Sequence, residues 1–284
     1  MPVGGRSEFA DGTQSLHCYL GPMKWIITSA AALMAALIGL PVTANARTIC
    51  TVVEDVASGQ VLISKGDCKR RITPASTFKI AISLMGYDAG VLTDAQAPAL
   101  AYDESYGAWR ADWKQTTDPT SWMARSVIWY SQQMTTALGE ARFGRYVRDF
   151  QYGNNDVSGG LTRAWLSSTL KISPLEQVGF LRRMLRGDLP VSRHAVEMTE
   201  QITALPDPVA RWTIHGKTGS GAPRTADGAY DRAHEFGWFV GWAANGERKV
   251  TFAHLVQAER TSDELSGVRA KREFLAAFPS LLRQ

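Results

Sequence analysis

The 284-residue chain has few of the residues that build metal centres or disulfide-rich domains. It contains three cysteines and five histidines, and no two histidines are spaced as a pair of metal ligands. Its carboxylates form no catalytic constellation either. The sequence therefore predicts no metal site, and it excludes a scaffold that depends mainly on disulfides.

Long apolar runs and concentrated charge are also scarce. The apolar run at residues 25–40 is too short and wrongly flanked for a membrane span. The net charge is +4, and the densest basic runs are only Lys69-Arg70-Arg71 and Arg182-Arg183. No basic stripe is interleaved with aromatics, so we interpret the basic residues as a solvated face and expect no nucleic-acid partner.

The start of the chain predicts export. Met23-Lys24 precedes the apolar run, and Ala44-Asn45-Ala46 follows it. A charged start, a short apolar core and an Ala-x-Ala end are typical of a secretory signal peptide, with cleavage expected after Ala46. We therefore expect a periplasmic protein that has no membrane contact after cleavage.

Residues 1–22 fit no part of the signal pattern. We expect that translation starts at Met23 and that the upstream stretch is an annotation artefact. The chain is thus divided into an extension (1–22), a signal peptide (23–46) and a single catalytic domain (47–284). Such a domain is long enough to bury a core without a metal or a partner, and we expect a monomer or a homodimer.

The order of the predicted elements indicates an α+β fold. Strands come first, helices occupy the middle, and strands return before a last helix, so the terminal strands must pair. We predict an antiparallel sheet of N- and C-terminal strands, covered by helices, with an inserted helical lobe. The predicted strands are 51–56, 60–63, 211–215, 236–243 and 249–257, and the predicted helices are 76–89, 122–138, 174–187, one from 192, and 269–282.

Two cysteines remain after the predicted cleavage, Cys50 and Cys68. They stand at the open ends of the predicted hairpin 51–63, where opposite positions bring Cβ atoms close together. An oxidising compartment permits a bridge. We favour a Cys50–Cys68 disulfide over the alternative of two buried free thiols.

A Ser-x-x-Lys motif at Ser76-Thr77-Phe78-Lys79 is the first candidate for chemistry. Ser76 opens a long apolar helix after Pro74, and Lys79 follows one turn later on the same face, so its amine can reach the hydroxyl. A desolvated lysine can act as the base that activates a serine. Ser168-Thr169-Leu170-Lys171 also fits the pattern, but Ser168 precedes a helix cap and we interpret it as an ordinary surface residue.

Lys217-Thr218-Gly219 ends an alternating strand and is followed by Ser220. A lysine and a threonine on a strand edge can offer a cation and a hydroxyl to a substrate carboxylate, and the backbone can offer an N–H to an oxyanion. Each motif alone is weak. Together, Ser-x-x-Lys at a helix start and Lys-Thr-Gly on a later strand resemble the serine β-lactamases and penicillin-binding proteins.

Further motifs resemble one family, the class D (oxacillinase-type) serine β-lactamases. The resemblance covers the chain from about Cys50 to the last helix, and the absence of Ser-Asp-Asn argues against class A and most penicillin-binding proteins. One departure is isoleucine where the family usually has valine. The matching segments are Ser126-Val127-Ile128, Tyr152-Gly153-Asn154, Trp165-Leu166 and Gly237-Trp238-Phe239-Val240-Gly241-Trp242.

The resemblance implies a serine β-lactamase whose base is a carboxylated Lys79 (an N6-carboxylysine). It implies that Ser76 is the nucleophile, that Trp165 donates its indole N–H to the carbamate, and that Ser126 passes a proton to the lactam nitrogen. The backbone N–H groups of Ser76 and Ser220 would form the oxyanion hole. No cofactor is implied beyond CO₂ or bicarbonate to carboxylate the lysine, and the expected partner is a small β-lactam substrate.

The resemblance also implies a set of substrate contacts. Many class D enzymes hold the substrate carboxylate with a late arginine that we cannot place here, so the anchor would be Lys217 and Thr218 with Ser266, and Arg269 is a further candidate. For Trp113, core or surface packing is an equal alternative to substrate contact. The complete set of expected contacts is Lys217, Thr218, Gly219, Ser220, Ile128, Leu166, Trp113 and Ser266.

Two other functions share this fold. A β-lactam sensor domain would be acylated without turnover, but such domains are normally attached to several transmembrane helices, and this sequence shows only a predicted cleavable signal. A penicillin-binding carboxypeptidase would act on peptidoglycan peptides, but its usual Ser-x-Asn motif is missing. The sequence therefore favours hydrolysis of β-lactam antibiotics through an acyl-serine intermediate.

Overall fold

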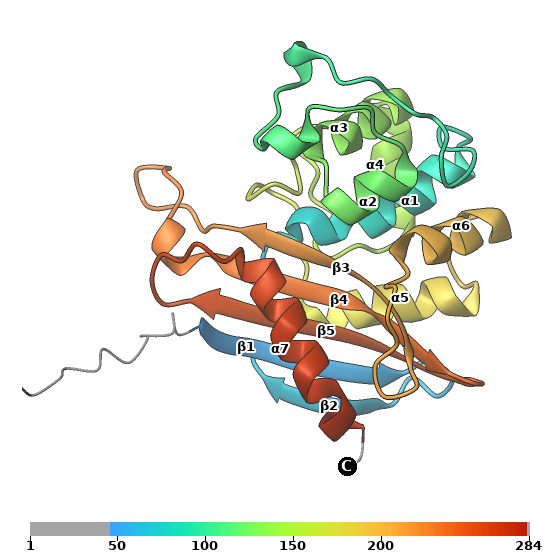
Figure 1. Ribbon diagram of the computed structural model, residues 1–284, viewed down its shortest axis with the longest axis vertical. Helices are drawn as coiled ribbons and strands as arrows, with labels where there is room; N and C mark the ends of the chain where they lie inside the picture. The colour runs from blue at the N-terminus through green and yellow to red at the C-terminus, as the bar shows by residue number, and fades with distance from the viewer. Residues whose placement is uncertain (1–45, 283–284) are drawn as a thin grey trace, which may run out of the picture. The chain divides into compact units, whose positions relative to one another are not determined.

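Strands from both ends of the described chain form one five-stranded antiparallel sheet (Figure 1). The structure is a computed structural model that describes residues 46–282, so the expectations for residues 1–22 and for the signal peptide up to residue 45 lie outside the described residues. The strands follow the order β2-β1-β5-β4-β3. Their bounds are β1 Ala46–Asp55, β2 Val61–Gly66, β3 Thr213–Gly221, β4 Phe236–Asn245 and β5 Arg248–Ala258.

The first strand pairs with the last one. Cys50 lies opposite Leu255, and Val53 lies opposite Phe252. β5 occupies the centre of the sheet and is buried along most of its length, as its run of apolar residues requires. The predicted α+β fold, with a sheet built from N- and C-terminal strands, is confirmed.

Helices cover both faces of the sheet, and a helical lobe stands beyond its β3 edge (Figure 1). α7 packs on β3, β4 and β5, while α5 packs on β1, β4 and β5 from the other face. The lobe comprises α1 to α4 together with α6. The helix bounds are α1 Lys79–Asp88, α2 Pro119–Arg125, α3 Ile128–Leu138, α4 Glu140–Asp149, α5 Pro174–Arg186, α6 Arg193–Thr203 and α7 Ser266–Leu281.

α1 is the central helix of the lobe. Every residue from Lys79 to Tyr87 is buried, as expected for a helix that is apolar on most faces. It packs against α3 and α6 and follows directly on a short 3₁₀ helix, η1 (Ala75–Phe78). This placement puts the Ser-x-x-Lys motif where the lobe meets β3.

Two predicted helices differ from the observed ones. The helix expected over 76–89 begins as the 3₁₀ turn η1, so Ser76 lies just before α1 rather than inside it. The helix expected over 122–138 is broken at Ser126, which has a left-handed backbone with φ of 60° and divides α2 from α3. The break turns the chain so that Ser126 leaves the helical hydrogen-bond ladder. The cap predicted at Ser173 is present, since Ser173 and Glu176 form a reciprocal capping box.

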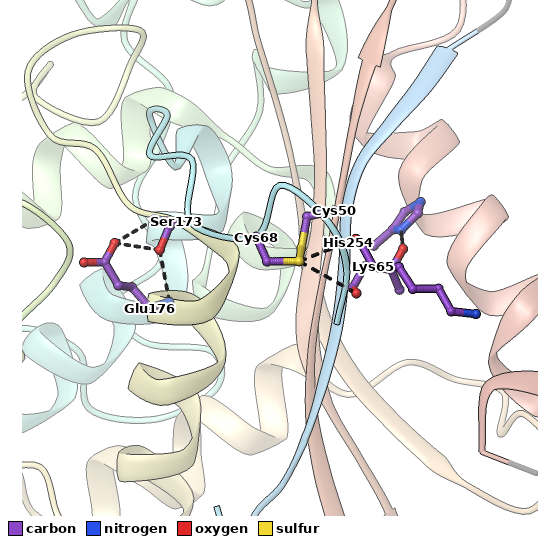
Figure 2. Close-up of a disulfide and its surroundings, with 7 residues drawn as sticks. Cys50, Lys65, Cys68, Ser173, Glu176 and His254 are labelled. Carbon is purple, nitrogen blue, oxygen red and sulfur yellow. Dashed lines mark hydrogen bonds between the residues drawn. A yellow bond between two sulfur atoms is a disulfide. The ribbon is translucent and has the colours of Figure 1, made fainter. Parts of the chain in front are cut away.

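The predicted disulfide is present. Cys50 on β1 is bonded to Cys68, which follows β2, and the two Cα atoms are 5.0 Å apart. Figure 2 shows the bridge between the Ser173–Glu176 cap at the start of α5 on one side and His254 of β5 on the other. It therefore ties the open end of the β1–β2 hairpin beneath the segment that leads to Ser76.

The bridge gives a first prediction. It joins residues 18 positions apart, and closing a loop of this size should stabilise the fold by about 3 kcal/mol. Cys50→Ala/Cys68→Ala should lower the free energy of unfolding in urea by about this amount, with little change in turnover. Mass spectrometry of the native protein after alkylation, without reductant, should find neither cysteine modified; two alkylated cysteines would contradict the bridge.

Candidate active site

The turn that carries Ser76 is held from several sides. The Thr77 hydroxyl donates to the Pro74 carbonyl at 2.7 Å, and the Ala75 N–H donates to the Trp165 carbonyl at 3.1 Å. Ala75 has a φ of 50°, a left-handed conformation that costs a residue with a side chain about 1–2 kcal/mol. These bonds hold a strained turn that leaves Ser76 half-buried while its neighbours enter the core.

Lys79 lies within reach of the serine. Its Nζ is 3.4 Å from Ser76 Oγ, and the side chain is fully buried. Burial lowers the pKa of Lys79 well below its usual range, and the positive charge of Lys217 lowers it further. The lowered pKa favours the neutral amine, which is the form that can accept a proton.

A buried polar network supports the turn from behind. The Gln177 side-chain amide donates to Thr77 Oγ1 at 3.0 Å, and the Tyr152 hydroxyl lies 3.4 Å from Gln177 Oε1. Tyr152 also packs its ring against Phe78, with centroids 5.0 Å apart. The Tyr-Gly-Asn segment thus acts on the catalytic turn through Gln177, a residue that no sequence motif marked.

Trp165 contributes an unsatisfied donor. The side chain is fully buried, and its Nε1 has no hydrogen-bond partner among the described residues. The centroid of its ring lies 5.6 Å from that of Phe78, and Phe78 is the residue that precedes Lys79 in the sequence. A buried N–H without an acceptor costs about 1–3 kcal/mol, which indicates a position where an acceptor is needed.

Lys217 reaches the site from β3, the edge strand of the sheet. It is 4% exposed, and its Nζ lies 3.2 Å from the Thr218 carbonyl oxygen and 3.4 Å from the Thr218 hydroxyl. Burial lowers the pKa of Lys217 to about 7, and the charge of Lys271 on α7 contributes. The cation is therefore easily lost unless an anion binds beside it.

Gly219 brings the edge strand against the turn that carries Ser76. A Cβ at this position would lie 2.8 Å from the Pro74 carbonyl oxygen and 3.2 Å from the Ser76 nitrogen, so a side chain would push β3 away from the turn. The next residue, Ser220, accepts a hydrogen bond from the Gly267 N–H at 2.9 Å. The strand is thereby fixed between η1 and the start of α7.

Ser76 and Ser220 border a cleft of about 550 Å³, whereas Lys79, Trp165, Lys217 and Gly219 lie behind its lining. Four of the predicted residues line it: Ser76, Ile128, Leu166 and Ser220. Ten lining residues were not predicted, because no motif marked them as site residues: Ala75, Trp109, Arg163, Ser167, Gly221, Ala222, Tyr230, Arg232, Glu235 and Leu265. Three of these ten, Trp109, Tyr230 and Leu265, are exposed large hydrophobic side chains, so one side of the cleft offers apolar surface.

Three expected contacts have other surroundings. Trp113 is buried and donates its indole N–H to the Arg125 carbonyl at 3.0 Å, so it does not line the cleft; Trp109, which is 67% exposed, does. Ser266 is also buried, at the first residue of α7. The guanidinium of Arg269 is bonded to Glu264 and Ser262, which leaves it a poor candidate for a carboxylate anchor.

The second Ser-x-x-Lys segment has no such geometry. Ser168 and Lys171 lie in a loop, and no hydrogen bond joins their side chains in the part of the chain that the structure describes. Among residues 46–282 there is also no group of three or more His, Cys, Asp or Glu side chains that could hold a metal ion. No helix of the described segment is both long and apolar enough to cross a membrane.

Comparison with known proteins assigns the family. Residues 49–277 match the model of the penicillin binding protein transpeptidase domain. β-Lactamase OXA-9 of Klebsiella pneumoniae is 39% identical over 241 residues, covering 82% of this chain and 88% of that protein. β-Lactamase OXA-1 of Escherichia coli is 36% identical over 225 residues, covering 77% and 78%.

A solved structure agrees with these matches. The class D β-lactamase OXA-427 superposes with a TM-score of 0.78 at 46% identity, covering 82% of this chain and 98% of that chain. The chain therefore belongs to the family of penicillin binding protein transpeptidase domains. Within it, the chain is a member of the class D serine β-lactamases.

The pKa of Lys217 gives a second prediction. Because that pKa is lowered to about 7, the ammonium group is lost as pH rises through this value, and attraction for a substrate carboxylate is lost with it. The ratio of kcat/KM for a penicillin to that for its methyl ester should therefore fall from about pH 6 to about pH 9. Groups that act on both substrates alike cancel in this ratio.

Lys217→Ala is the matched variant for this measurement. It should lower kcat/KM for the free acid by about 10- to 100-fold, with a smaller loss for the ester. Its ratio should also be independent of pH. A parent ratio that does not change with pH would contradict carboxylate binding by a titrating Lys217.

Proposed function

We propose that the mature protein hydrolyses β-lactams through an acyl-enzyme formed on Ser76. The observation that carries the proposal is the pair of Ser76 and Lys79, with a fully buried amine 3.4 Å from the hydroxyl and a second buried lysine on the facing strand. In a class D β-lactamase, this pair is the nucleophile and its base.

Acylation uses groups from η1, α1, β3 and the break between α2 and α3. Lys79 accepts the Ser76 proton as Oγ attacks the lactam carbonyl, and the backbone N–H groups of Ser76 and Ser220 receive the developing oxyanion. Ser126, at the break between α2 and α3, passes a proton to the leaving nitrogen. In the second half of the reaction Lys79 accepts a proton from the water that attacks the ester carbonyl, and this proton passes to Ser76 Oγ as the acyl bond breaks and the product leaves.

We further propose that Lys79 is carboxylated. Reaction with CO₂ needs a neutral amine, and burial together with the charge of Lys217 favours that form of Lys79. The unpartnered Nε1 of Trp165 fits an added carboxylate, because it is a buried donor that lacks an acceptor. When present, the carbamate would supply an anionic base at neutral pH. The positive charge of Lys217, which repels an ammonium at Lys79, would attract the negatively charged carbamate.

We propose that polar residues of β3 bind the substrate carboxylate and that apolar residues opposite them contact the rest of the substrate. Lys217 and Thr218, with Ser266 behind them at the start of α7, would hold the ring carboxylate, while Gly219 allows close approach. Ile128 and Leu166 would flank the reacting bond as apolar walls. The aromatic contact expected of Trp113 is assigned instead to Trp109.

The remaining proposals concern the chain as a whole. We propose that residues 23–46 direct export to the periplasm and that residues 47–284 are the catalytic domain, acting as a monomer or a homodimer. Edman sequencing of the secreted protein should begin directly after Ala46. No nucleic acid or metal takes part in the proposed reaction.

Replacement of the two motif serines provides the third prediction. Ser76→Ala should abolish turnover of a chromogenic cephalosporin and the acyl-enzyme adduct in intact mass spectrometry, because no oxygen remains to attack. Ser168→Ala is the matched control and should retain the parent rate. Fast multiple turnover by the parent distinguishes a β-lactamase from a sensor or a carboxypeptidase, which would give one stoichiometric burst.

The fourth prediction concerns the carboxylated lysine. Degassing should lower turnover and added bicarbonate should restore it, and activity should also fall at mildly acidic pH, where carbamates lose CO₂. Trp165→Ala should lose at least about tenfold in kcat at ambient CO₂ and recover in part at high bicarbonate, because its N–H favours the charged carbamate. Turnover indifferent to bicarbonate in both proteins would leave Lys79 as a plain amine base.

A further inference from the structure

A second cavity adjoins the cleft and takes no part in the chemistry proposed above. It has a volume of about 340 Å³ and lies between the loop 70–73, the loop 167–171 and the segment 222–224 that follows β3. Ser167 and Ala222 line both this cavity and the cleft. The two spaces therefore share a wall at the end of β3.

Positive charge dominates this second cavity. Its lining contains no carboxylate and four cationic side chains: Arg70, Arg71, Lys171 and Arg224. Arg71 is neutralised by an ion pair with Glu176. Within the described residues Arg224 contacts neutral groups, the Gly228 carbonyl at 2.7 Å, the Tyr230 hydroxyl at 2.9 Å and the face of the Tyr230 ring, so no anion compensates its charge.

The other two cations are also without ion pairs. Neither Arg70 nor Lys171 has a carboxylate within 4.0 Å in the described part of the chain. Asp156 is a charged neighbour of Lys171, but the two form no ion pair. The cavity therefore presents three uncompensated cations beside apolar surface from Ile49, Phe236 and Leu255.

A buried hydroxyl in the same cavity lacks a partner. Thr73 lines the cavity, is 6% exposed, and its Oγ1 has no hydrogen-bond partner among the described residues. The residue is held in place through its carbonyl, which accepts the indole N–H of Trp238 at 3.0 Å. An unmet buried hydroxyl is costly, and a ligand with an acceptor group would satisfy it.

The direction of the substrate connects this cavity to the cleft. In a β-lactam, the ring carboxylate and the acylamino side chain lie on opposite sides of the carbonyl that is attacked. With the carbonyl at Ser76 and Ser220 and the carboxylate at Lys217, the side chain must extend along β3 toward Gly221 and Ala222. Ala222 belongs to the shared wall, so the end of a long side chain reaches the second cavity.

We infer that this cavity is a subsite for β-lactam side chains that end in a carboxylate, an inference that rests on the proposed function. The methylene chain of such a group lies against Ile49, Phe236 and Leu255. Its carboxylate is bound by Arg70, Lys171 and Arg224 and accepts a hydrogen bond from Thr73. Charge-assisted hydrogen bonds of this kind are stronger than neutral ones and favour the anionic side chain over a neutral analogue.

A pair of substrates that differ in one charge tests the inference. The first is a cephalosporin acylated with glutarate, and the second is the same compound with the side-chain carboxylate converted to its primary amide. Both keep the ring carboxylate and the β-lactam, so the ratio of their kcat/KM values reports the side-chain charge alone. The parent should prefer the glutaryl compound by about tenfold at low ionic strength, less at high salt.

Three variants locate the effect. Arg70→Gln/Lys171→Gln should reduce the preference to less than about threefold, because two of three cations are gone. Thr73→Val removes only the hydroxyl and should reduce the preference by about two- to threefold. Arg142→Gln/Arg145→Gln, a matched loss of two charges at exposed positions of α4 outside the cavity, should leave it unchanged.

Benzylpenicillin separates this inference from the proposed function. All three variants should hydrolyse benzylpenicillin at the parent rate, because its side chain carries no anion. A parent that shows no preference, or a preference that survives in Arg70→Gln/Lys171→Gln, would overturn the subsite while leaving the β-lactamase intact. Failure of the parent to turn over benzylpenicillin at all would instead overturn the proposed function.

Discussion

The burial of two lysines in one site is the constraint on which the rest of the structure depends. Lys79 is fully buried and Lys217 nearly so, and burial disfavours the charged form of each while their mutual repulsion disfavours both charges together. A site of this kind favours a neutral amine and attracts anions. One anion would be the carbamate proposed on Lys79, and the other would be the substrate carboxylate at Lys217.

The fold brings these lysines together by placing an edge strand against a helix start. Lys217 lies on β3, the edge strand beside β4, and Lys79 is the first residue of α1 in the helical lobe. Gly219 removes the side chain that would separate the two elements. Because β1 pairs with β5, the same sheet that orients β3 also carries the disulfide-linked hairpin leading to Ser76.

The features that were predicted correctly depend on residues close together in the sequence, and the features that were missed depend on tertiary packing. The Ser76–Lys79 pair, the hairpin with its disulfide, the Ser173 cap and the pairing of terminal strands all follow from spacing and periodicity. The break at Ser126 does not, because the residues around it have helical periodicity and only tertiary contacts favour its left-handed backbone. Trp109 was missed in favour of Trp113 because both lie in one loop, and composition cannot say which ring is buried.

The site stores several unfavourable features, and the aromatic core around it holds them in place. Ala75 and Ser126 have left-handed backbones, and Trp165 keeps a buried N–H without a partner. Phe78, the residue before Lys79, packs against the rings of Phe143, Tyr152 and Trp165, with centroids 5.0 to 6.0 Å apart. Such packing resists relaxation of the strained turn, because any shift of Phe78 would open voids against three rings at once. The geometry of Ser76 and Lys79 is thus set by apolar contacts that take no part in the proposed reaction.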